Sequence, residues 1–159
     1  MGITRGFSIQ NPASIERELK IVSRNLPIEQ KVLARCPDWE DAWVIYADDL
    51  GTSGSFASDL DPHYPKSKLH VFYQRAFHAM QRAHLFGRKD YFGASHLFWG
   101  SAIFSDARHP ALALKALQES YPILTGYPHI ESQQVYLLKL LYSSWSASDT
   151  GEMKKAKKK

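Results

Sequence analysis

The sequence contains a single cysteine, Cys36, among its 159 residues. A lone cysteine cannot form an intramolecular disulfide or supply a cysteine-rich zinc site, so the chain does not resemble a disulfide-stabilised secreted domain. The first ten residues hold no apolar stretch of signal-peptide length, and Glu16 and Glu18 follow soon after them. We therefore expect an intracellular protein, most simply a cytoplasmic one, and leave import into an organelle open.

Long hydrophobic runs are also missing. The longest stretch without Lys, Arg, Asp or Glu that we expect to be helical runs from Tyr91 to Ser105. It is shorter than the roughly 20 residues that span a bilayer, and it contains His96. We expect a buried helix here and no membrane span.

Signals for β-structure are scarce. There is no convincing run of alternating β-branched residues, and neither Asn-Gly nor Asp-Gly occurs as a hairpin turn. Apolar residues recur at helical spacing instead, as in Ile15, Leu19, Val22 and Leu26. We predict an all-α fold, a compact bundle of about six or seven helices, with stacked helical hairpins as a variant.

Capping residues, prolines and glycines set the expected helix boundaries. The predicted helices cover residues 11–26, 27–36, 38–50, 66–86, 91–105, 110–120 and 130–145, and residues 51–65 and 121–128 are expected to be loops. Pro27 should open the second helix, with Ile28, Val32 and Cys36 facing inward. Together these helices predict a single domain over residues 1–145 and a flexible lysine-rich tail over residues 146–159.

The motifs of common enzymes are missing as well. No Gly-x-Ser-x-Gly elbow or Gly-rich phosphate loop occurs, and the seven histidines lack metal-binding spacing. Tyr46-Ala47-Asp48-Asp49 resembles the Tyr-x-Asp-Asp signature of reverse transcriptases, in which the carboxylates bind metal ions. Because that chemistry needs a further aspartate from a separate strand, we interpret the string as the acidic end of an aromatic helix near Leu50. We expect no catalysis, no cofactor and no metal.

Basic residues follow a regular pattern where acidic ones are absent. Between residues 62 and 89 there is no Asp or Glu, and basic side chains recur at spacings of seven, three, four and seven. Such spacings place them along one face of a helix, where they would be either a solvated surface or a binding surface. The candidate binding surface consists of Lys68, Arg75, His78, Arg82 and Lys89, together with Lys154, Lys155, Lys157, Lys158 and Lys159 of the tail.

Two functions fit this pattern. The first is a non-catalytic protein-interaction domain, a small subunit or adaptor within a larger intracellular assembly, because Trp, Tyr and Arg dominate protein interfaces. The alternative is a nucleic-acid-binding regulator that uses Lys68, Arg75, Arg82, Lys89 and the lysine tail. The first is our leading hypothesis, because most basic helix faces are simply solvated. A protein partner is therefore expected, and nucleic acid is a second candidate.

Overall fold

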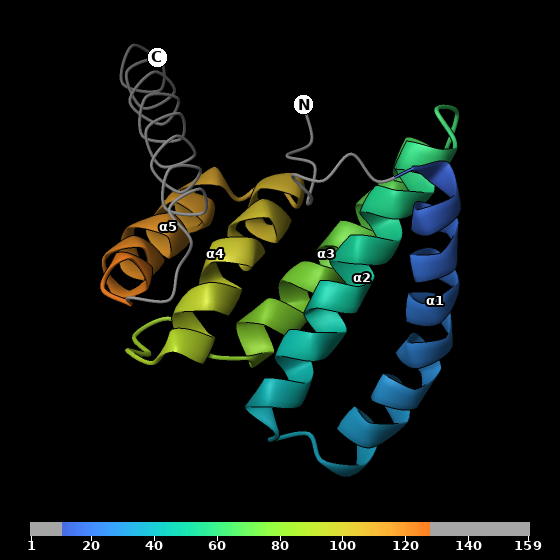
Figure 1. Ribbon diagram of the computed structural model, residues 1–159. Coiled ribbons are helices and arrows are strands. Elements are labelled where there is room, and N and C mark those ends of the chain that lie inside the picture. Colours follow the sequence, from blue (N-terminus) through green and yellow to red (C-terminus); the bar gives the residue numbers. More distant parts are fainter. Residues whose placement is uncertain (1–10, 128–159) are drawn as a thin grey trace, which may run out of the picture. The chain divides into compact units, whose positions relative to one another are not determined.

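The computed structural model describes residues 11–127, which contain five α-helices and no strand (Figure 1). The helices are α1 (Pro12–Arg35), α2 (Glu40–Leu60), α3 (Lys66–Arg82), α4 (Tyr91–Asp106) and α5 (Pro110–Thr125). The all-α class is thus confirmed. The count of six or seven helices is not confirmed, because six were predicted within this range, and the seventh, over residues 130–145, lies outside the described residues.

These helices divide into two compact units, with the boundary between His84 and Leu85. In the first unit, α2 packs against both α1 and α3 (Figure 1). In the second unit, α4 packs against α5. The expectation of one domain over residues 1–145 stays a prediction, and the tail over residues 146–159 lies outside the described residues.

Helix α1 begins where the sequence predicts. The side chain of Asn11 accepts a hydrogen bond from the amide of Ser14 at 2.9 Å, and Pro12 occupies the first turn. The predicted break at Pro27 is wrong, because α1 continues through it to Arg35. Pro27 is exposed, so the Ser23 carbonyl that loses its amide partner lies on the solvent side, where water can satisfy it.

Because α1 does not restart at Pro27, its second half keeps the helical phase of the first. The predicted inward positions Ile28 and Cys36 are therefore wrong: Ile28 is 61% exposed, and Cys36 is exposed too. The stripe that begins at Leu19, Val22 and Leu26 continues through Glu29 to the buried Leu33.

Helix α2 covers most of the segment that was predicted to be a loop over residues 51–65. The helix runs to Leu60, so the acidic pair Asp48 and Asp49 lies in mid-helix and not near its end. Small side chains allow α3 to approach closely, since a Cβ added at Gly54 would lie 3.1 Å from Cβ of Phe72. The glycines and serines that resemble a loop in the sequence thus form a helix–helix contact surface.

The connection after α3 begins earlier than predicted. The helix ends at Arg82, not at Phe86, and the chain reverses through His84 and Gly87, which have positive φ angles of 48° and 86°. Lys89 is therefore not on the helix that carries Lys68, Arg75, His78 and Arg82.

The second unit has a core of small and aliphatic side chains contributed by α4 and α5. Leu97 and Leu117 are almost fully buried there. Asp90 occupies the predicted start of α4, and its pKa is lowered by Arg88, whose guanidinium reaches its carboxylate at 2.7 Å. The loop predicted over residues 121–128 is wrong up to Thr125, since α5 accommodates Pro122 on its exposed side. Within residues 11–127, no helix combines the length and the apolar character required to cross a membrane.

A candidate binding pocket between α2 and α3

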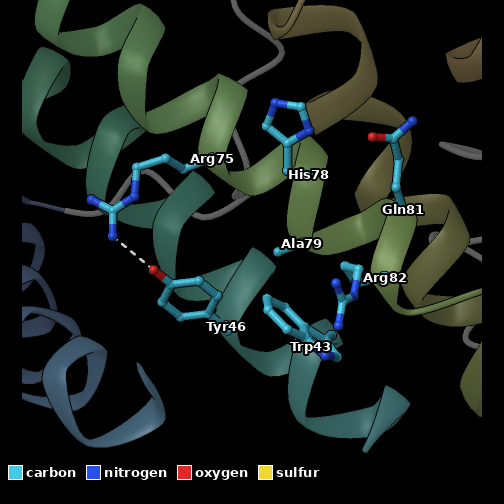
Figure 2. Close-up of a pocket in the computed structure, with 7 residues that line it drawn as sticks. All are labelled: Trp43, Tyr46, Arg75, His78, Ala79, Gln81 and Arg82. Atoms are coloured by element: carbon cyan, nitrogen blue, oxygen red, sulfur yellow. Dashed lines mark hydrogen bonds between the residues drawn. The ribbon is translucent and has the colours of Figure 1, made fainter. Parts of the chain in front are cut away.

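An open pocket of about 490 Å³ lies in the first unit, between α2 and α3 (Figure 2). Its lining combines aromatic, basic, amide and small side chains, contributed by Trp43, Tyr46, Arg75, His78, Ala79, Gln81 and Arg82. Trp43 and Tyr46 are three residues apart on α2, so they share a face of the helix, and their rings meet edge to face at 6.2 Å. The other five residues occupy consecutive turns of α3, which places the basic groups beside the aromatic pair.

Tyr46 links all three helices of the first unit. Its hydroxyl oxygen accepts a hydrogen bond from Nη2 of Arg75 on α3 at 2.7 Å and another from Nε2 of Gln30 on α1 at 2.9 Å. The Tyr46 side chain is 7% exposed, so these bonds lie in a partly dry environment that strengthens them. The arrangement fixes Arg75 at one end of the pocket although the residue is exposed.

Arg82 is held at the other end by the second aromatic ring. Its guanidinium carbon lies 4.9 Å from the ring centroid of Trp43, a cation–π contact. The carbonyl oxygen of Pro37 accepts from Nε1 of Trp43 at 2.8 Å and from Nη2 of Arg82 at 3.5 Å. The turn between α1 and α2 therefore orients both the indole and the cation.

The two arginines are bonded to neutral oxygen atoms among the described residues. Within residues 11–127, neither Arg75 nor Arg82 lies in an ion pair, and the atoms that hold them are a hydroxyl and a carbonyl oxygen. Glu40, at the start of α2, is instead 3.0 Å from Nδ1 of His84. Because a guanidinium has five N–H donors and stays charged at all physiological pH values, each arginine keeps donors for an external anion.

The structure brings together three of the predicted surface residues in the pocket. Arg75, His78 and Arg82 are exposed and line the pocket. Lys68 is exposed on α3 outside the pocket, and Lys89 belongs to the second unit. The tail lysines, Lys154, Lys155, Lys157, Lys158 and Lys159, lie outside the described residues.

Sequence reasoning missed the other half of this pocket. Trp43, Tyr46 and Gln30 are not among the residues of the predicted binding surface. The available signal was the spacing of three between two aromatic residues that carry polar atoms. The register of α2 against α3, which places these rings beside Arg75 and Arg82, comes from tertiary packing and leaves no mark on the local pattern.

A second polar cluster lies where α1 meets α2. Burial, followed by a hydrogen bond to Asp49 and the negative charge of Asp49, raises the pKa of Glu29 to about 8. Oε2 of Glu29 is buried and has no hydrogen-bond partner among the described residues, which further disfavours ionisation. At neutral pH the two carboxyl groups therefore share a proton, with Glu29 donating to Asp49.

Neither cluster offers the ligands of a metal ion. Among residues 11–127, no three His, Cys, Asp or Glu side chains are grouped closely enough to bind one. Comparison of the chain with protein-family models, with curated proteins and with solved structures gives no match. Function must therefore be inferred from the residues of this chain.

Proposed function

We propose that this chain is a non-catalytic protein-interaction domain, a small subunit or adaptor, and that a partner docks at the pocket between α2 and α3. One observation carries the proposal: two permanent cations, which have no acidic partner within residues 11–127, lie beside a Trp–Tyr pair in one open pocket. Trp, Tyr and Arg are the residues that contribute most energy at the centres of protein interfaces.

The alternative, nucleic-acid binding, is supported by the exposed basic residues of α3. One feature favours a protein. Binding of single strands relies on aromatic faces on which bases stack, but Arg82 covers one face of Trp43, and Tyr46 is buried.

The test is affinity capture from cell extract with two variants of equal charge change. Arg75→Gln/Arg82→Gln alters the pocket, whereas Lys66→Gln/Lys68→Gln removes two exposed charges from the first turn of α3. We expect the wild-type chain to capture proteins that remain bound after nuclease treatment. The arginine variant should fail to capture these proteins, and the lysine variant should still capture them. Capture that requires intact nucleic acid, or that falls equally with both variants, would contradict the proposal.

A further inference from the structure

We propose that the pocket recognises an acidic segment of its protein partner that carries two carboxylates about 10 Å apart. This rests on the proposed function and adds the chemistry and geometry of the ligand. It begins from the positions of the two cations: Arg75 and Arg82 are seven residues apart on α3, and at 1.5 Å per residue their backbones are separated by about 10 Å along the helix axis.

The side chains do not close this separation. Arg75 is bonded to the hydroxyl of Tyr46, whereas Arg82 lies on the ring of Trp43 and points to the carbonyl of Pro37. Figure 2 shows the two guanidinium groups at different ends of the aromatic pair. A single small anion could reach both arginines only if one of them left its contacts. Two separate carboxylates could each bind one arginine in its observed position.

The middle of the pocket combines one apolar and two polar side chains of α3. Ala79, which is 1% exposed, lies between the two arginines in the sequence of α3, as do the exposed His78 and Gln81. The rings of Trp43 and Tyr46 border the pocket from α2. A short linker between the two acidic groups, with a small apolar side chain that can lie against Ala79 and the rings, is compatible with this lining.

The bonds of Tyr46 give Arg75 a fixed direction. With Gln30 and Arg75 both donating to the same hydroxyl oxygen, the position of this cation depends on α1 as well as α2. Tyr46 and Gln30 are thus positioning residues. Pre-organisation of a charged donor reduces the entropy that is lost on binding. Removing the Tyr46 hydroxyl should therefore lower the affinity for the ligand, although the charge of Arg75 remains.

The experiment compares two labelled hexapeptides of identical composition, GEALEG and GAEELG. In the polyproline II conformation, which repeats every three residues at about 3.1 Å per residue, the glutamates of the first lie on one side about 9 Å apart, and those of the second are adjacent and point to different sides. We expect the full-length protein to bind GEALEG roughly tenfold more tightly at low salt. We expect three single substitutions to lower the affinity for GEALEG several-fold and to remove most of the preference for it over GAEELG: Arg75→Gln, Arg82→Gln and Tyr46→Phe. The control, Lys66→Gln/Lys68→Gln, should keep the preference. Circular dichroism checks that every variant is folded.

The outcomes separate the two proposals. Equal binding of both peptides, lost in the arginine variants, overturns the spacing and leaves the protein-interaction function intact. Tighter binding of a peptide with one phosphoserine, GApSALG, overturns the spacing in the same way, because one anion would then suffice. If neither acidic peptide binds and a ten-nucleotide oligouridine does, in a manner that depends on Arg75 and Arg82, both proposals fail.

Discussion

Glu29 occupies a core-facing position of α1, where an aliphatic residue would continue the stripe that leads to Leu33. The carboxyl group is tolerated there because it stays protonated and donates a hydrogen bond to Asp49, which faces it from α2. A pair of this kind stabilises the folded state only while one member stays protonated. Its consequence is a dependence of stability on pH in a range where most carboxyl groups no longer titrate.

The direction of that dependence follows from the raised pKa. In the unfolded chain Glu29 loses its proton near 4.5, and in the folded chain it loses it near 8. The contribution of the protonated Glu29 to the free energy of unfolding is therefore fully present below pH 4.5 and declines as pH rises toward 8. Above pH 8 this contribution is lost, and stability no longer changes through Glu29. Glu29→Gln keeps a donor toward Asp49 without the titration. Urea unfolding at several pH values should show the stability of the wild type relative to this variant falling between pH 4.5 and 8.

Asp49→Asn separates the causes of the shift. Burial is the largest of them, so the variant should reduce the pH dependence without abolishing it. If the free energies of unfolding of the wild type and of Glu29→Gln change with pH in the same way between pH 5 and 8, Glu29 is ionised in the folded protein. That result would contradict the raised pKa.

Helix α1 contains one proline in its interior and one in its first turn, and the two should destabilise the folded state by different amounts. Pro27 lies in the interior and removes one backbone hydrogen bond, whereas Pro12 lies in the first turn, where no bond is lost. We expect Pro27→Ala to raise the free energy of unfolding by about 1–3 kcal/mol and Pro12→Ala to change it by less than about 0.5 kcal/mol. Urea unfolding followed by circular dichroism measures both. Equal effects would indicate that the α1 backbone is broken at Pro27 in solution.

The local signals in the sequence predicted where helices begin better than where they end. Asn11 and Asp90 mark helix starts through short-range chemistry, and both lie where expected. The helix ends predicted at Leu26 and Leu50 were wrong because tertiary packing outweighs local propensity. Gly54 allows α2 to approach Phe72 closely, and the exposed Pro27 is compatible with a helix that packs through its other face. Neither reason is visible without the neighbouring helix.

At the scale of the whole chain, opposite charges are segregated onto neighbouring helices. Helix α2 has five carboxylates and no Lys or Arg, whereas α3 has four Lys or Arg and no carboxylate. The sequence pattern predicted Arg75, His78 and Arg82 as surface residues because charge follows the helical period. It could not predict Trp43, Tyr46 and Gln30 beside them, since that grouping depends on the register of three helices.

The division into two compact units leads to a prediction about fragments. Helix α2 packs against α1 and α3 within the first unit, which also contains the pocket. We expect a fragment of residues 1–84 to be helical and to unfold cooperatively, although a chain of this size is only marginally stable. Circular dichroism during urea unfolding tests this. A fragment without helical structure would support the single domain over residues 1–145.

The exposed Cys36 provides the chain with a natural reporter. It is the single thiol of the sequence, so a maleimide dye would attach at one position without any engineered cysteine. The next residue, Pro37, contacts both Trp43 and Arg82 through its carbonyl oxygen. A dye at Cys36 would therefore lie next to the turn that orients one end of the pocket, and its emission should change when a ligand binds Arg82 beside the indole.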